Sequence, residues 1–303
     1  MGNRENSLRL REPNLADKLL YQKILKDAKW EYPIGKLIAH GGMSTIYELK
    51  TPEKAPRQVL KVIDTRMIKQ KYRHIVRAHG LDECSVMGEL AQRSEFIMPL
   101  YGCVWSEVPD KSWKKVLGQE DERIYLLQMP WATNLLTVSG MPEREIIQLG
   151  MDICSALQVC YLSGRIHRDV KPDNIYIKKN RERLCYLLGD FGIARVVDNR
   201  TLTGIGTEQY LAPELCGGWL TRDSDIYSLG VTMFVMAGGK FGTGDTSGEL
   251  ARGNKLDWQT FKNETKISYG LQNILRKALQ NHGVRYRQPS EMYDELWCLQ
   301  QWG

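Results

Sequence analysis

Apolar residues recur with helical periodicity near the start of the chain. The pattern covers residues 13–29, and Pro13 stands where a first helical turn tolerates proline. It predicts an amphipathic helix with an apolar face that consists of Leu15, Leu19, Leu20, Ile24 and Leu25. We expect this helix to pack on the domain that follows it. The alternative is a docking or dimerisation element.

The period shortens to two at residues 59–63, which predicts a strand. Its odd positions share one face, so Lys61 lies on an otherwise apolar surface. A lysine in such a place is costly unless an anion pairs with it. The apolar run 124–131 predicts a buried strand that ends in an extended connector, because Pro130 disfavours helix at the residue before it. A second buried strand is predicted at 184–188.

Helical periodicity returns in the second half of the chain. Residues 142–164 predict a long core helix that ends near Gly164, and a further apolar helix is expected from residue 223 onwards. The apolar positions of the predicted helix 142–164 are Ile146, Ile147, Ile153, Leu157 and Tyr161.

Composition describes an ordinary soluble protein. The chain has 303 residues, of which 42% are hydrophobic and 26% charged. Its apolar runs are far shorter than the roughly 20 residues of a membrane span, and residues 1–11 are too polar for a signal peptide. The net charge of +6 is scattered, with short clusters at 66–77 and 181–183, which favours a solvated surface over a nucleic-acid partner.

The cysteines predict a reduced protein. There are seven, an odd number without a C-x-x-C pair, which argues against a disulfide framework and against a zinc site. Cys154, Cys160 and Cys185 stand in apolar stretches and are expected in the core. This pattern indicates a cytoplasmic location.

Residues 167–174 carry the densest candidate chemistry. The carboxylate of Asp169 is followed by the cation of Lys171 and the amide of Asn174, and a second carboxylate, Asp190, follows the later apolar run. Such groups can hold a hydroxyl, a triphosphate and a divalent metal in line. A polar turn between a helix and a strand is the alternative, which the complete ordered set makes the weaker interpretation.

This set, with the Asp-Phe-Gly sequence that begins at Asp190, resembles the catalytic and metal-binding loops of Hanks-type Ser/Thr protein kinases, and its style is similar to bacterial members. The resemblance covers about residues 32–299. It implies an α+β, bilobal fold with a small antiparallel sheet lobe and one main helix, followed by a larger, mainly helical lobe. The implied division is an N-terminal helical extension at 1–31 and a kinase domain at 32–303, with an N-lobe about 32–127, a hinge about 128–133 and a C-lobe about 134–303.

The resemblance assigns a role to each residue of this set. Asp169 would accept or orient the proton of a substrate hydroxyl, and Lys171 would lie near the transferred phosphate. Asn174 and Asp190 would hold Mg²⁺, or Mn²⁺ in its place, with ATP as the phosphate donor. The acceptors would be Ser and Thr hydroxyls of protein substrates.

Residues 38–46 occupy the place of the kinase glycine-rich loop. Small residues there let backbone N–H groups approach the phosphates, while apolar neighbours cover the adenine. The usual first glycine is Ala39 and the third is Ser44, which leaves Gly41 in register. The residues expected to bind ATP are Ile38, Ala39, His40, Gly41, Gly42, Met43, Ser44, Thr45 and Ile46.

By the same resemblance, Lys61 would contact the α- and β-phosphates. Its partner on the next helix would be Glu83, with Glu89 as the alternative. Gln128 stands near the gatekeeper position, ahead of the connector. Backbone atoms of the connector would bind adenine, those of Met129 and Trp131.

Residues 206–214 resemble the end of a kinase activation segment. Thr207 would contact the catalytic aspartate and lysine, which favours Ser/Thr acceptors over Tyr. Glu214 is expected to pair with Arg285. Asp225 is expected to be buried and to cap the backbone of the catalytic loop, since a buried carboxylate needs partners.

Autophosphorylation is expected between the two motifs. Thr201 and Thr203 are the candidates, of which Thr203 is preferred, and Arg168 would pair with the phosphate. A homodimer would allow this reaction in trans. Two alternatives to an active kinase stay open: a pseudokinase that serves as a nucleotide-binding interaction module, and a small-molecule phosphotransferase, which would not be expected to carry the 206–214 motif.

Overall fold

The computed structural model describes residues 11–41, 43–70, 73–107, 122–135, 140–179, 183–191, 195–196, 208–216, 219, 221–241 and 256–302. The chain forms two compact units. The first consists of Met1–Gly88 and Pro99–Trp131, and the second of Glu89–Met98 and Ala132–Gly303. The short segment Glu89–Met98 therefore belongs with the second unit, because Met98 N–H donates to Leu188 O and Leu188 N–H donates to Phe96 O, each at 2.8 Å.

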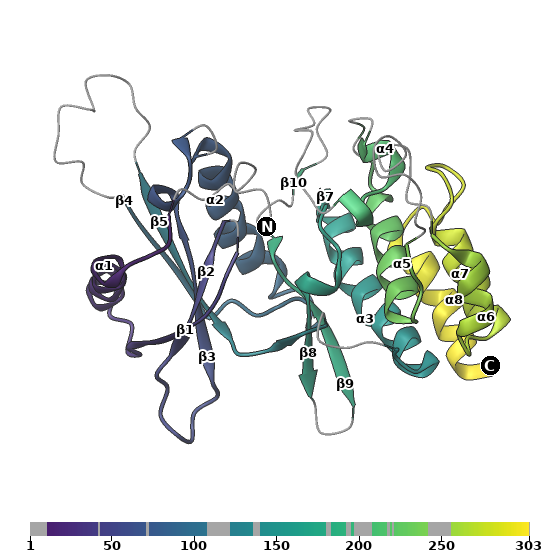
Figure 1. The fold of residues 1–303 in the computed structure, drawn as a ribbon, viewed down its shortest axis with the longest axis horizontal. Helices are drawn as coiled ribbons and strands as arrows, with labels where there is room; N and C mark the ends of the chain where they lie inside the picture. Colours follow the sequence, from purple (N-terminus) through teal and green to yellow (C-terminus); the bar gives the residue numbers. More distant parts are fainter. Residues whose placement is uncertain are drawn as a thin grey trace. The chain divides into compact units, whose positions relative to one another are not determined.

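The first unit is a five-stranded antiparallel sheet with helices (Figure 1). Its strands lie in the order β1-β2-β3-β5-β4, so β4 and β1 are the edges. The strands are β1 Ile34–His40, β2 Thr45–Leu49, β3 Gln58–Asp64, β4 Gly102–Glu107 and β5 Arg123–Pro130. The helices are α1 Leu15–Asp27, the 3₁₀ turn η2 Thr65–Met67 and α2 Arg73–Leu90.

Helix α1 packs on the sheet, as the periodicity predicts, through part of the predicted face: Ile24 and Leu25 are in the core and Leu20 packs against it. Asn14 caps its N-terminus in a capping box with Asp17, so Pro13 lies just before the cap rather than in the first turn. Leu15 and Leu19 are 73% and 63% exposed. The residues that join the core on α1 are Tyr21, Ile24 and Leu25, which pack with Ile34, Tyr47, Leu49, Leu60, Val62, Ile124 and Leu126 of the sheet.

The second unit is mainly helical (Figure 1). Helix α3 (Glu143–Leu162) matches the predicted core helix and contacts α5 (Ser224–Met236), α8 (Pro289–Trp302) and β9 (Leu184–Leu188). The other helices are α4 Pro213–Cys216, α6 Trp258–Glu264 and α7 Tyr269–Ala278. Two small antiparallel sheets complete it, in the orders β6-β8-β9 and β10-β7. Their remaining strands are β6 Thr133–Asn134, β7 Arg165–Ile166, β8 Ile175–Lys179 and β10 Arg195–Val196, with 3₁₀ turns η6 Pro172–Asn174 and η8 Glu208–Tyr210.

Candidate active site

The loop between β7 and η6 carries the candidate catalytic residues of the second unit. Asn174 donates from Nδ2 to the Asp169 carboxylate at 2.7 Å and to the Asp169 carbonyl at 2.8 Å. Lys171 Nζ lies 2.8 Å from the same carboxylate. The structure thus brings Asp169, Lys171 and Asn174 together, with one carboxylate oriented by a cation and an amide.

Asp225 holds the backbone of this loop. Its carboxylate accepts from His167 N–H at 2.6 Å and from Arg168 N–H at 2.8 Å. Arg168 has a φ of +71°, a backbone conformation that residues other than glycine rarely adopt. Asp225 is buried, and burial raises the pKa of its carboxyl. The predicted cap is confirmed, and it stabilises an unfavourable backbone conformation beside Asp169.

The β8–β9 hairpin connects the catalytic loop with Asp190. Gly189 N–H donates to Asn174 O at 2.9 Å, and His167 Nε2 lies 3.0 Å from Gly189 O. The His167 ring also packs edge-on against Phe191, with centroids 4.7 Å apart. Asp190 has φ of +62°, so it shares the left-handed conformation of Arg168. These contacts tie the two motifs into one structure, and sequence reasoning missed the bridging role of His167.

The donor set suits a metal held jointly with phosphates. Among the residues that the structure describes, no group of three or more His, Cys, Asp or Glu side chains could hold a metal alone. Asn174 offers a neutral oxygen and Asp190 an anionic one, on segments joined by the Gly189–Asn174 hydrogen bond. Mg²⁺ is usually bound by one or two carboxylates together with substrate phosphates. The residues therefore fit a Mg²⁺–nucleotide complex.

In the first unit, Lys61 on β3 pairs with Glu83 on α2. The Nζ–Oε1 distance is 2.5 Å, and the residues are 5% and 0% exposed. Glu83 is thus confirmed as the partner. The alternative, Glu89, is exposed and lies 3.4 Å from Arg165 in the second unit.

A cross-strand row contains Lys61 and shows which residue of β5 shares its face. Lys61 lies opposite Leu127 on β5, so the side chains of these two residues share a face. Gln128 belongs to the other face, where its Nε2 donates to Gln58 Oε1. A difference of one residue along a strand reverses the face, so Gln128 does not share the face of Lys61, and its place near the gatekeeper position stays a prediction. The row as a whole consists of Ala39, Ile46, Lys61, Leu127 and Cys103.

In the connector after β5, one of the backbone groups expected to bind adenine already has a partner in the protein. The Trp131 N–H donates to Arg57 O at 2.9 Å, and the Arg57 guanidinium lies 3.8 Å from the centroid of the Trp131 ring. That N–H is engaged within the first unit, and Pro130 has none. The Gln128 carbonyl is engaged as well, since it accepts from Tyr101 N–H at 2.8 Å, and adenine binding by backbone groups of Met129 and Trp131 stays a prediction.

The glycine-rich loop is the tight connection of the β1–β2 hairpin. His40 pairs with Thr45, and Gly41 N–H donates to Ser44 O at 2.9 Å. Ile46 lies opposite Lys61, whereas Ile38 falls where the β1 register shifts. Met43 lies in the same turn, and Gly42 lies outside the described residues.

The end of the activation segment is anchored as predicted. Arg285 donates from Nη2 to Glu214 Oε2 at 2.8 Å, and its side chain is fully buried. Asp223 joins this cluster, 2.8 Å from His282 Nδ1, an interaction for which the sequence carried no signal. Thr201, Thr203 and Thr207 lie outside the described residues.

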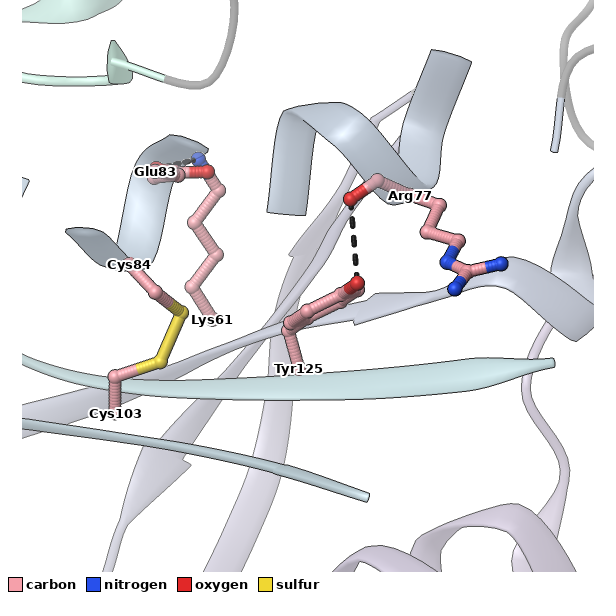
Figure 2. The surroundings of a disulfide bond; sticks show 6 residues. All are labelled: Lys61, Arg77, Glu83, Cys84, Cys103 and Tyr125. Carbon is pink, nitrogen blue, oxygen red and sulfur yellow. Dashed lines mark hydrogen bonds and ion pairs between the residues drawn. A yellow bond between two sulfur atoms is a disulfide. The ribbon is translucent and has the colours of Figure 1, made fainter. Parts of the chain in front are cut away.

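One prediction about the cysteines is wrong. Cys84 on α2 and Cys103 on β4 form a disulfide, with Cα atoms 6.0 Å apart (Figure 2). The odd total concealed this pair, because a count cannot show which side chains meet in the fold. Cys154, Cys160 and Cys185 are buried free cysteines, as expected. The cysteine pattern therefore no longer supports a cytoplasmic location, which stays untested.

Comparison with known proteins agrees with this geometry. The family model of the protein kinase domain matches residues 32–291, so the chain belongs to the protein kinase domain family. The serine/threonine-protein kinase PknB of Mycolicibacterium smegmatis is 25% identical over 276 residues, 88% of this chain and 42% of that protein. PknB of Mycobacterium leprae is 34% identical over 170 residues, 53% of this chain and 27% of that protein.

A plant relative matches the same share of this chain as PknB of Mycolicibacterium smegmatis. CBL-interacting protein kinase 10 of Oryza sativa is 24% identical over 277 residues, 88% of this chain and 56% of that protein. The chain spans less than half the length of the PknB relatives. Within the part of the chain that the structure describes, no helix is long and apolar enough to cross a membrane.

Proposed function

We propose that this chain is an ATP-dependent Ser/Thr protein kinase that transfers the γ-phosphoryl group of Mg²⁺-ATP to protein hydroxyls. The observation that carries the proposal is the Asp169 carboxylate, held at 2.7–2.8 Å by both Asn174 and Lys171. Phosphoryl transfer depends on positioning and on neutralising charge rather than on covalent chemistry. The Ser/Thr kinases among the relatives support this choice of acceptor.

Each residue of the catalytic loop has a task in this reaction. Asp169 orients the acceptor hydroxyl and takes up its proton as the new bond to phosphorus forms. Lys171 supplies positive charge next to that carboxylate, where the transferred phosphoryl group gains negative charge. Asn174 and Asp190 would hold Mg²⁺, which neutralises phosphate charge when bound.

The first unit would bind the nucleotide. Lys61 brings a cation to an apolar sheet face, and Glu83 fixes its orientation toward the α- and β-phosphates. Backbone groups of residues 38–46 would cover the phosphates, and Met129 and Trp131 would line the adenine site. Gly41 has the space for a close approach, because a Cβ added there would meet nothing within 4 Å.

Autophosphorylation of Thr201 or Thr203, in trans within a transient homodimer, belongs to the same proposal. Arg168 is the residue expected to pair with the phosphate, and Thr207 is expected to contact Asp169 and Lys171. Mass spectrometry of the chain after incubation with Mg²⁺-ATP tests this. Phosphate confined to residues outside 201–207 would contradict it.

The test of the main proposal is a phosphorylation assay with Mg²⁺-ATP and a generic protein substrate such as myelin basic protein. Asp169→Asn is expected to lower kcat by about 10²- to 10⁴-fold, because the proton acceptor is lost. Asp294→Asn removes the same charge from an exposed position of α8 and is the matched control. Equal activity of Asp169→Asn and wild type, or none in either, would favour the pseudokinase.

A further inference from the structure

Helix α2 is fastened to the Lys61 face of the sheet at three points (Figure 2). Tyr125 Oη donates to Arg77 O at 3.2 Å. One and a half to two turns further along α2, Glu83 accepts from Lys61, and the next residue, Cys84, forms the disulfide with Cys103. The first contact holds the early part of the helix, and the other two hold the part that carries Glu83.

The disulfide and the ion pair both join α2 to the cross-strand row that contains Lys61, Leu127 and Cys103. Lys61 and Cys103 both lie opposite Leu127, one on each side of it. Their partners, Glu83 and Cys84, are consecutive in α2. Because neighbouring helical residues move together, a movement of the α2 backbone that takes Glu83 away from Lys61 also shifts Cys84, which is covalently bound to β4.

The disulfide is also less buried than the free cysteines of the core. Cys84 and Cys103 are both half-buried, and β4 is an edge strand. The free thiols of Cys154 and Cys160 are buried, and burial raises the pKa of each, which makes them inert. Thiol–disulfide exchange requires access to sulfur. A reductant would therefore reach this bond and leave the core thiols untouched.

We propose that the Cys84–Cys103 disulfide is a redox-controlled clamp that keeps Glu83 paired with Lys61, so that a dithiol reductant loosens α2 and lowers phosphoryl transfer. This proposal deepens the proposed function and rests on it, because kinase activity requires the lysine–glutamate pair. A thiolate of the reductant attacks one sulfur and forms a mixed disulfide. Its second thiol then closes the reductant's own disulfide, so that two electrons and two protons pass to Cys84 and Cys103.

The ion pair by itself is a weaker clamp than the covalent bond. A buried pair gains Coulomb energy but bears the desolvation cost of both charges. After reduction the Tyr125–Arg77 contact still holds the early part of α2. We therefore expect local loosening around Glu83 rather than unfolding of the unit.

The experiment compares the full chain poised with oxidised glutathione and with dithiothreitol. Peptide mapping without reduction first verifies the Cys84–Cys103 bond. Hydrogen exchange of residues 73–90 is then measured next to kinase activity. Reduction is expected to speed exchange in the second half of α2 and to lower kcat/KM by about tenfold, within the range typical of coupled sites. Reoxidation is expected to restore both.

The variants separate the clamp from other thiol effects. Cys84→Ser/Cys103→Ser is expected to behave like the reduced chain in both buffers, whereas Cys298→Ser, at an exposed cysteine of α8, should respond like wild type. Failure to find the bond, equal exchange of α2 in the two states, or equal activity despite unequal exchange would overturn the proposal. Redox-dependent exchange in a chain that phosphorylates nothing would refute the kinase function and with it the control of phosphoryl transfer, and would show only that the disulfide fastens α2.

Discussion

At the scale of single residues, the active site depends on backbone conformations that are costly by themselves. Arg168 and Asp190 both have positive φ, and each such non-glycine residue costs about 1–3 kcal/mol. The two N–H bonds to Asp225 stabilise the first of them. The Gly189–Asn174 and His167–Gly189 contacts restrain the segment next to the second. Neighbours on other elements therefore maintain the strained positions.

Asp225→Asn is expected to weaken both stability and catalysis. An amide offers one acceptor oxygen, so the N–H of His167 or of Arg168 is left buried without an acceptor. The expected loss in the free energy of unfolding is about 1–3 kcal/mol. A larger fall in kcat than in substrate affinity is expected, because Asp169 is the next residue in the loop. Denaturant unfolding and steady-state kinetics measure the two effects, and an unchanged kcat would contradict the positioning role.

At the scale of elements, α1 shows how charged side chains fasten a helix to the sheet beside it. Asp17 is buried in the first turn, 2.5 Å from Arg11 and 3.2 Å from Arg66. Burial alone would raise the pKa of Asp17, but the bonds from Arg11 and the Asn14 N–H outweigh it and hold the pKa below the usual 3.8. Tyr21 adds a 2.7 Å hydrogen bond to Asp64. These contacts anchor the extension to the sheet.

The lowered pKa of Asp17 predicts a pH-dependent contribution to stability. A carboxyl with a depressed folded-state pKa stabilises the fold above its unfolded value near 3.8, and the contribution is lost as pH falls through the folded value. Asp17→Asn should therefore lower the free energy of unfolding by about 1 kcal/mol near pH 6. The difference from wild type should shrink below pH 3.8.

Denaturant titrations over this range measure the effect. Asp27→Asn, which removes the same charge from the other end of α1, is the control and should change stability by less than about 0.5 kcal/mol at pH 6. A pH-independent difference for Asp17→Asn would refute the electrostatic explanation.

At the scale of the whole molecule, contacts between distant segments define each unit. In the second unit, the buried Arg285 joins the segment before α8 to Glu214 on α4, 71 positions earlier in the chain. It also lies 3.6 Å from Asp223, just before α5. One guanidinium therefore connects three helical segments.

Arg285→Leu is expected to destabilise the second unit by about 3–5 kcal/mol, because the carboxylate of Glu214 loses its charged partner in a largely buried place and keeps only hydroxyl donors. Arg287→Leu, at an exposed position two residues away, is the matched control and should have little effect. Thermal unfolding monitored by circular dichroism distinguishes the two. Similar midpoints for both variants would show that the buried pair does not support the fold.

The sequence alone was enough to predict those features whose residues lie close together in the chain or follow a regular period. Asp169, Lys171, Asn174 and Asp190 could be singled out because three of them lie within six residues of one loop and their order resembles that of the protein kinase motifs. Periodicity located α3, β5 and β9, since a buried face imposes its period on the sequence. The pairs Lys61–Glu83 and Glu214–Arg285 were accessible by the same resemblance and are present in the structure.

Only the tertiary structure decided which faces and which distant residues meet. The apolar pattern of α1 did not show that Leu15 and Leu19 stay exposed, because burial depends on what packs against a helix. A shift of one residue placed Leu127 rather than Gln128 on the face of Lys61. The seven cysteines argued for a reduced chain, yet α2 and β4 bring Cys84 and Cys103 together. Sequence determined the chemistry of this kinase domain, whereas register and packing determined which side chains share a surface.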